Sequence, residues 1–231
     1  MRLAFLADAH GNSVGLAACL ERIAAFEVAE TYFLGDAVGY LSDPQPALRL
    51  LAGAGVKCQK GNHEAMLLGG LPLDPRRDAF YRLDRQRAEL PPERLEELSA
   101  WPVRREIACD GARLLLSHGS PSPSLEERVH EDTPWQPGPD FAFDGAFIGH
   151  THRPFVRRVG DVLLVNVGSC GLPRDRGDLA AFVIYDGQQR AARIYRVPFD
   201  VERALALHGA GVPDEVRAVF ARRGPFHGEV V

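Results

Sequence analysis

The chain has 231 residues, a length that fits one compact domain with a substantial buried core. Its 27 Lys and Arg residues against 31 Asp and Glu residues give a net charge of -4, which provides no electrostatic footprint for duplex nucleic acid or for an anionic membrane surface. The amino terminus enters a strand pattern at once and no stretch approaches the roughly 20 apolar residues of a membrane span, so we expect a cytoplasmic protein without a membrane partner.

We expect a single domain over residues 1–231, with short helices and a tail from about residue 200. The four cysteines lie far apart and show no Cys-x-x-Cys spacing: Cys19, Cys58, Cys109 and Cys170. This spacing indicates neither a thiolate zinc site nor a disulfide framework. We therefore expect reduced thiols, most of them buried.

The first part of the chain alternates short apolar runs with helical patterns. The runs that predict strands are residues 3–7, 31–34 and 56–59. After the first run, Asn12 and Ser13 offer an N-cap for an amphipathic helix. After the second run, Ser42-Asp43-Pro44 precedes a helix that is expected to end at Gly53 and Gly55. This order predicts two βαβ units.

The rest of the chain changes character twice. Residues 74–101 carry charges among spaced apolar residues, which predicts one or two surface helices, broken at Pro91-Pro92 and without ligand candidates. From Val103 onward strands dominate, with hairpin signals at Asp110-Gly111, Gly160-Asp161 and Asp186-Gly187. Residues 120–140 form an irregular connection of a length that often covers sites. Residues 200–223 show two short helical patterns around Pro213, and we expect the tail after them to be poorly fixed.

Side chains that ligate metals stand directly after five apolar runs. The runs are residues 3–7, 31–34, 56–59, 114–116 and 146–148. The pieces that follow them are Asp8-Ala9-His10, Gly35-Asp36, Gly61-Asn62-His63-Glu64, Ser117-His118 and Gly149-His150-Thr151-His152. If the runs are neighbouring strands of buried sheets, their ends fall along one edge, where ligands distant in sequence converge. Together the pieces indicate a two-metal site for phosphoester hydrolysis.

Asp36 is the candidate bridge between two divalent cations. Cations roughly 3.5–4 Å apart need a bridging carboxylate, because neutral ligands alone leave their mutual repulsion unrelieved. The alternative for Asp36 is a turn-forming role after glycine. Asp8 and His10 lie two residues apart at a strand end, so they can point the same way and chelate one ion. The alternative for this pair is polar decoration of the surface.

His150 and His152 repeat the two-residue spacing at the end of another strand, and Gly149 removes a side chain from the approach. Their alternative is a pair of exposed loop histidines. His118 is a further nitrogen ligand, with a core-edge histidine satisfied by backbone as the alternative. Asn62 offers an amide oxygen, and its alternative is a helix N-cap for residues 63–68.

His63 is assigned a different role. An imidazole beside a metal-binding Asn but directed at the substrate can donate a proton to a departing alkoxide, so His63 is the candidate general acid. The remaining histidines stand in polar loop or tail segments without a partner at ligand spacing, and we leave them out of the site: His130, His208 and His227.

In this order, the five pieces resemble the calcineurin-like metallophosphoesterase superfamily over residues 1 to about 186. The chain is most similar to the small bacterial and archaeal phosphodiesterase-type members, which it also resembles at Asn166-Val167-Gly168-Ser169 and Pro173-Arg174-Asp175. The resemblance implies an α/β fold, a four-layer sandwich of two mixed β-sheets flanked by helices. It also implies a division of ligands: Asp8, His10, Asp36 and His152 around one ion, and Asp36, Asn62, His118 and His150 around the other.

The chain departs from one branch of that superfamily. Ser/Thr protein phosphatases have Asp-Arg-Gly where this chain has Gly39-Tyr40-Leu41, so their phosphate-gripping arginine is missing. This departure argues against a eukaryotic-type protein phosphatase acting on phosphopeptides. Three other arginines, Arg153, Arg174 and Arg176, are candidates for gripping an extra phosphate, with solvated surface charge as their alternative.

The expected activity is in-line hydrolysis of a small phosphate ester, a phosphodiester or a phosphomonoester. A hydroxide bridging the two cations attacks phosphorus, and His63 protonates the leaving oxygen. Oxygen and nitrogen ligands without thiolate suit manganese, our preferred metal, and also iron or zinc. The alternatives are a non-catalytic interaction scaffold on the same fold and a mononuclear zinc hydrolase. Neither the physiological substrate nor the oligomeric state is predicted.

Overall fold

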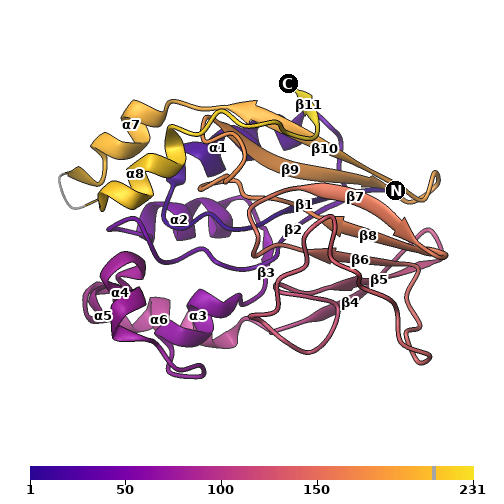
Figure 1. Cartoon of the computed structure of the whole chain (residues 1–231), viewed down its shortest axis with the longest axis horizontal. Helices are drawn as coiled ribbons and strands as arrows, with labels where there is room; N and C mark the ends of the chain where they lie inside the picture. Colours follow the sequence, from indigo (N-terminus) through magenta and orange to yellow (C-terminus); the bar gives the residue numbers. More distant parts are fainter. Residues whose placement is uncertain (210–211) are drawn as a thin grey trace.

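The computed structural model describes residues 1–209 and 212–231 and contains two β-sheets packed face to face (Figure 1). The first sheet has the strand order β11-β10-β9-β1-β2-β3 and the second has the order β4-β5-β6-β8-β7. Both sheets are mixed: β1 pairs parallel with β2 and antiparallel with β9, and β8 pairs parallel with β6 and antiparallel with β7. The expected class, α/β with two mixed sheets flanked by helices, is confirmed.

The strands of the first sheet are β1 (Arg2–Leu6), β2 (Glu30–Phe33), β3 (Lys57–Cys58), β9 (Leu179–Asp186), β10 (Ala191–Pro198) and β11 (Glu229–Val230). Those of the second are β4 (Arg105–Cys109), β5 (Ala112–Leu116), β6 (Gly145–Ile148), β7 (Phe155–Val159) and β8 (Val162–Asn166). The helices are α1 (Ser13–Ala24), α2 (Gln45–Gly53), α3 (Asn62–Leu67), α4 (Pro75–Tyr81), α5 (Leu83–Glu89), α6 (Pro92–Ala100), α7 (Val201–Ala206) and α8 (Asp214–Phe220).

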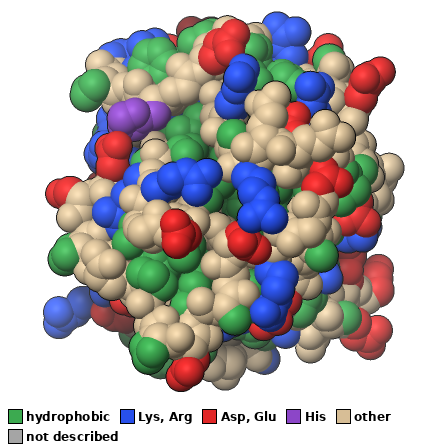
Figure 2. Space-filling view, turned by 90° about the vertical axis from the view of Figure 1, so that its right-hand side faces the viewer, with side chains coloured by type: hydrophobic (Ala, Val, Ile, Leu, Met, Phe, Trp, Pro, Cys, Tyr) green, Lys and Arg blue, Asp and Glu red, His purple; other side chains and the backbone are tan. Residues whose placement is uncertain are grey.

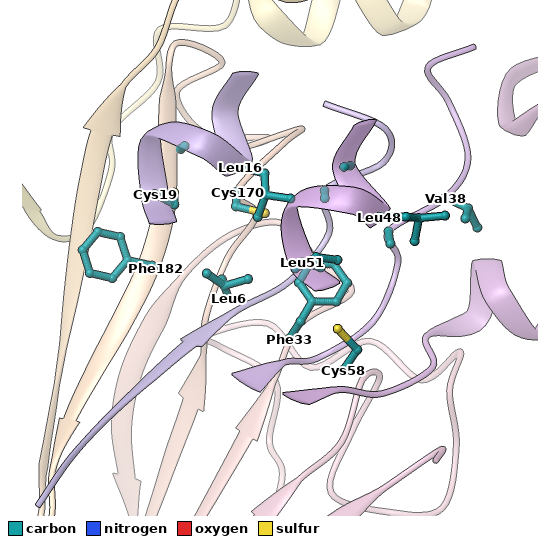
Figure 3. Packing of buried hydrophobic residues seen from close by; sticks show 14 of the residues in the cluster. Leu6, Leu16, Cys19, Phe33, Val38, Leu48, Leu51, Cys58, Cys170 and Phe182 are labelled. Atoms are coloured by element: carbon teal, nitrogen blue, oxygen red, sulfur yellow. The ribbon is translucent and has the colours of Figure 1, made fainter. Parts of the chain in front are cut away.

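Alternation along β1 divides its apolar side chains between two cores. Leu3 and Phe5 face the second sheet, where Phe5 stacks on Phe147 with ring centroids 4.2 Å apart. Leu6 points to the opposite face and packs with Leu16 of α1 in the other core (Figure 3). The sheet is therefore buried on both sides, which explains why its strands are continuous apolar runs.

The two helices that follow β1 and β2 begin where the sequence indicates. The Asn12 side chain caps α1 by accepting hydrogen bonds from the amides of Val14 and Gly15, at 3.1 and 3.0 Å. In the second case, Pro44 occupies the N-cap of α2 without a side-chain bond, while Asp43 accepts from the amide of Gln45 at 2.9 Å. Both helices pack against the outer face of the first sheet (Figure 3).

Irregular chain covers the outer face of the second sheet. Trp135, Phe141 and Phe143 of the long connection between β5 and β6 pack against a cluster that includes Leu115 and Ile148. The expected irregular segment thus covers part of this face of the second sheet.

Two expectations for local structure were wrong. Residues 74–101 form three helices, because Arg82 adopts a left-handed conformation (φ 61°) that ends α4 and begins α5. The carboxyl-terminal tail is tied down, since Glu229 and Val230 pair in parallel with Tyr195 and Arg196 of β10. Pairing with an exposed sheet edge satisfies backbone groups that the sequence pattern alone leaves open.

The parallel strands place their carboxyl ends at one side of the molecule. β1 starts near the amino terminus at the right of Figure 1 and runs toward the helices at the left. Leu6 pairs with Phe33 at the end of β2, and Leu116 of β5 pairs with Phe147 of β6. The segments that follow these strands therefore meet between the sheets and the helices.

The opposite side of the molecule carries mixed charge. Figure 2 shows Lys and Arg side chains interspersed with Asp and Glu on the face at the right of Figure 1. Among the described residues, no helix has both the length and the apolar character needed to cross a membrane.

Candidate metal centre

The structure brings all seven expected ligands and His63 into one buried cluster. All eight residues are at most 7% exposed: Asp8, His10, Asp36, Asn62, His63, His118, His150 and His152. Three groups have donor atoms within 4.8 Å of one another. Two of them are Asp8 with His10 and His152, and Asp36 with His118 and His150, and the third, His10 with Asp36 and His63, overlaps both. The segments after β1, β2, β5 and β6 and the first turn of α3 supply them.

Asp36 lies between the two groups. Its Oδ2 atom is 3.2 Å from His118 Nε2 and 3.7 Å from His10 Nε2. On the far side of His10, His152 Nε2 is 3.1 Å from His10 Nε2 and 3.2 Å from Asp8 Oδ1. On the other side, Asn62 Oδ1 is 3.0 Å from His118 Nε2. This is the placement that a carboxylate shared by two cations requires.

Backbone strain is concentrated at the same residues. Five of the seven expected ligands have left-handed backbone conformations, although none is glycine: Asp8 (φ 57°), His10 (φ 48°), Asp36 (φ 62°), His150 (φ 66°) and His152 (φ 58°). Such conformations cost about 1–3 kcal/mol each and persist only where the surroundings determine them. Backbone hydrogen bonds hold the loops together, from Asp8 to Gly35 at 2.9 Å and from His10 to Asp36 at 3.0 Å.

Three histidines are held in the same tautomer. The Nδ1 atoms of His10, His118 and His152 lie 2.9, 2.8 and 2.7 Å from backbone carbonyl oxygens of Val38, Leu34 and Leu172, respectively. A carbonyl oxygen only accepts, so Nδ1 carries the proton and donates it. In each neutral ring, Nε2 then presents its lone pair to the cluster. Bonding of the outer ring nitrogen to a carbonyl is the usual support of a metal-ligating histidine.

These lone pairs need a cation. His10 Nε2 and His152 Nε2 face each other at 3.1 Å, and when both rings are neutral neither nitrogen has a proton to share. Asp8 Oδ1 and His150 Nε2 are buried without a hydrogen-bond partner. Burial lowers the pKa of His150 to about 3 and that of His152 to about 4, so both rings are neutral at pH 7. Neutral imidazoles and ionised carboxylates are the forms that bind metals, so these residues fit divalent cations.

His118 differs in its protonation. Burial lowers its pKa, but the carboxylate of Asp36 opposes this and raises the pKa of His118 to about 9. The metal-free protein therefore holds a protonated His118 at pH 7. Its proton must leave before Nε2 can bind a cation.

The apparent affinity for Mn²⁺ is expected to rise by up to about tenfold per pH unit between pH 7 and pH 9. Below the pKa of His118 each binding event releases its proton, and above it no proton is released. Calorimetric Mn²⁺ titration in buffers of different ionisation enthalpy measures both quantities. His118→Gln removes this group and should flatten the dependence, whereas a wild-type affinity that is constant from pH 7 to 9 would contradict the assignment.

His63 lacks the carbonyl bond that the three ligands share. Its Nδ1 atom has no hydrogen-bond partner, and its Nε2 atom is 3.9 Å from Asp36 Oδ2. The ring packs on the backbone of Gly39, where a methyl group would lie 2.1 Å from Nδ1. His63 is therefore not oriented by a carbonyl group as the three ligands are, although it lies close to His10 and Asp36. Gly39 leaves room for its ring because it has no side chain.

For several residues, the non-ligand role that the sequence left open does not hold. Gly61 is the N-cap of α3, so Asn62 is not a cap and its side chain faces His118. His118 does bond to backbone, but only through Nδ1. Among the arginines, Arg176 pairs with Asp178 at 3.0 Å and Arg153 is exposed, whereas Arg174 reaches the site by donating to the Tyr40 hydroxyl at 3.1 Å. The three histidines left out lie outside the cluster.

Two supporting residues were not recognised from the sequence. The buried carboxylate of Glu64 accepts the amides of Asp36, Ala37, Val38 and Gly61 at 2.7–3.2 Å and so clamps the loop that carries Asp36. Asn166 donates to the Gly149 carbonyl at 2.7 Å and to Thr151 Oγ1 at 3.0 Å, which orients the loop of His150 and His152. The only signal for either was its place in a motif that resembles the superfamily.

Two face-to-face mixed sheets with a buried His/Asp cluster at their carboxyl ends define a metallophosphoesterase-type α/β sandwich. The chain belongs to the calcineurin-like phosphoesterase superfamily, whose domain model matches residues 1–190. Membership indicates a hydrolase of phosphate esters, and the resemblance read from the sequence is confirmed.

The relatives are small prokaryotic proteins. Uncharacterized protein MJ0912 of Methanocaldococcus jannaschii is 29% identical over 223 residues, 87% of this chain and 89% of the relative. The crystal structure of a metallophosphoesterase from Sphaerobacter thermophilus has a TM-score of 0.78 and 26% identity, and the match covers 96% of this chain and 98% of that one. Hypothetical protein PH1004 from Pyrococcus horikoshii OT3 has a TM-score of 0.80 at 20% identity, covering 100% and 99% of the two chains, a likeness that shows the fold alone.

Proposed function

We propose that this protein hydrolyses small phosphate esters with two divalent cations and uses His63 as the general acid. The observation that carries the proposal is the convergence of the Nε2 atoms of His10, His118 and His152, fixed by carbonyl bonds at Nδ1, on both sides of Asp36. Asp8, His10 and His152 would hold one ion, and His118, His150 and Asn62 the other, with Asp36 shared. Imidazole, carboxylate and amide donors suit Mn²⁺ best here, with iron or zinc as substitutes.

Bound divalent cations supply Lewis-acid chemistry: they neutralise charge on phosphoryl oxygens and lower the pKa of water toward neutrality. The chain's own residues make that chemistry available by orientation. Glu64 and Asn166 hold the ligand-bearing loops, so little reorganisation accompanies the reaction. Burial of the cluster limits the access of bulk water to the phosphoryl group.

His63 would supply the proton for the leaving oxygen. Burial lowers its pKa well below the ordinary value in the free protein, and the nearby Asp36 carboxylate opposes that effect. A phosphoryl anion bound beside the ring would act in the same direction as Asp36 and raise the pKa of His63, because negative charge favours the imidazolium. Protonation of His63 is thus linked to substrate binding.

Replacing His63 by asparagine is expected to lower kcat by about 100-fold for an alkyl phosphate ester, the usual scale of general acid catalysis. A 4-nitrophenyl ester should lose far less, since its leaving group departs without a proton. Both rates are measured at saturating Mn²⁺ together with the metal content, which should not change. Exposed His227→Asn is the matched control. Equal slowing of the two esters would show that His63 acts through something other than proton donation.

A direct test of the proposed function combines metal counting with a substrate panel. Metal-stripped protein is reloaded with Mn²⁺, iron or Zn²⁺, counted by elemental analysis, and assayed on a generic phosphodiester and a generic monoester. We expect two ions per chain and hydrolysis that depends on them. One ion per chain would support a mononuclear hydrolase, and two ions without hydrolysis of either ester would support a non-catalytic scaffold.

A further inference from the structure

A small hollow lies beside two tyrosines that contact the ring of the candidate acid His63. It encloses about 220 Å³ and is lined by Tyr40, Phe80, Tyr81, Leu172, Arg174 and Val216, among others. Leu172 and Val216 are buried and give it an apolar floor, while Phe80 at the end of α4 is 37% exposed. This volume is below the roughly 300–1,000 Å³ of pockets for drug-sized ligands, so the hollow suits one ring system and not an extended chain.

Two tyrosines that line this hollow contact the ring of His63. Tyr40 lies nearly parallel to the His63 ring, at 25° and 5.2 Å between centroids, and Tyr81 is tilted at 4.5 Å from it. Tyr40 and Tyr81 meet edge to face at 5.2 Å, and a backbone hydrogen bond of 2.8 Å from the Tyr40 amide to the Tyr81 carbonyl locks their relative position. The aromatic wall is therefore rigid and begins at the residue that would protonate the leaving oxygen.

Arg174 lies between the hollow and the metal centre. Its guanidinium donates to the Tyr40 hydroxyl at 3.1 Å, and its backbone amide donates to the His152 carbonyl at 3.2 Å. A cation at this position suits a phosphoryl oxygen of a substrate whose remaining part extends into the hollow.

We infer that the hollow binds a flat aromatic ring carried by the leaving alcohol of the substrate, so that the preferred phosphate esters are those of nucleoside-like alcohols. The inference rests on the proposed function for the position of phosphorus. A ring seated against Tyr81 stacks on an aromatic face, and its apolar edge covers Leu172 and Val216. Arg174 then contacts the phosphoryl group while His63 faces the leaving oxygen.

The test compares adenosine 5′-monophosphate with glycerol 1-phosphate, or the matching methyl diesters if the enzyme prefers diesters. Both leaving groups are primary alcohols of similar intrinsic reactivity, so their ratio reports the ring. Tyr81→Leu is expected to lower kcat/KM for the nucleotide by about tenfold, the effect of losing one base–aromatic stack. Loss of the contact between Tyr81 and His63 acts on both esters alike, so the nucleotide should lose about tenfold more than the glycerol ester. Tyr81→Phe keeps the ring and should keep both values.

A binding measurement separates this inference from the proposed function. Adenosine, which has no phosphate, is titrated into metal-free protein and followed by NMR shifts, with glycerol as the blank. We expect saturable binding in wild type and Tyr81→Phe that is lost in Tyr81→Leu. Absence of adenosine binding to the wild type, or an equal fall of both esters in Tyr81→Leu, would overturn the inference. Adenosine binding without any metal-dependent hydrolysis would support the inference that the hollow binds an aromatic ring and would contradict the proposed function.

Discussion

Asp36→Asn is expected to abolish metal-dependent hydrolysis, with a fall of about 10³-fold or more. The Asp36 carboxylate is the group that lies within 4 Å of three imidazoles, those of His10, His63 and His118. Partners that only support a metal ligand already contribute about 10- to 100-fold, and this carboxylate would be shared by both ions. Asparagine removes the negative charge that offsets the repulsion between two cations.

The asparagine variant tests chemistry without unfolding the site. Asp36 Oδ1 accepts the His63 amide at 2.8 Å, and an asparagine side-chain oxygen can accept the same bond, so α3 keeps its anchor. Turnover on a generic phosphate ester and Mn²⁺ content are measured side by side. Asp161→Asn, an exposed carboxylate in the hairpin before β8, is the matched control because that hairpin lies at the other end of the strand from Asn166. Undiminished hydrolysis by metal-stripped Asp36→Asn would end the proposal.

Glu64→Ala is expected to reduce the free energy of unfolding by about 3–5 kcal/mol, because each buried N–H donor left without an acceptor costs about 1–3 kcal/mol. Both Glu64 oxygens accept two amides each, Oε2 from Asp36 and Gly61 and Oε1 from Ala37 and Val38. Alanine leaves these buried N–H groups without acceptors. For a chain of this length, that reduction in the free energy of unfolding corresponds to a fall in Tm of roughly 6–20 °C.

Urea and thermal unfolding of the metal-free protein measure the effect without a contribution from bound ions. Glu64→Gln should fall between wild type and Glu64→Ala, because its amide oxygen replaces one acceptor while its NH₂ group opposes two N–H donors. Glu96→Ala, exposed on α6, is the control for loss of a surface carboxylate. If Glu64→Ala unfolds at the same urea concentration as Glu96→Ala, the clamp contributes nothing to stability.

The convergence of the candidate ligands could be predicted because of where they stand in the chain. Each expected ligand follows a strand or opens the helix after one, and parallel pairing of β1 with β2 and of β5 with β6 brings those ends together. Ligands at such ends are tied to the strand pattern, which the sequence displays directly. The roles of the individual residues, including the division between two ions, stay predictions.

Other features escaped the sequence pattern because they depend on contacts between distant segments. Tyr81 contacts His63 from the end of α4, in a segment, residues 74–101, that was expected to hold no ligand candidates. Arg174 meets Tyr40 across 134 positions of sequence. The fixed edge strand at Glu229 likewise depends on β10 being exposed at the sheet edge.

By itself, the sequence determined the alternation of strands and helices, the apolar runs that build both sheets, and the donor types placed at the strand ends. Only the tertiary structure decided which nitrogen of each histidine faces inward. That choice depends on the backbone carbonyl groups of Leu34, Val38 and Leu172, which belong to other segments of the chain. Every residue has such a carbonyl group. A backbone carbonyl leaves no mark in the sequence, so its power to orient an imidazole appears only when the chain is folded.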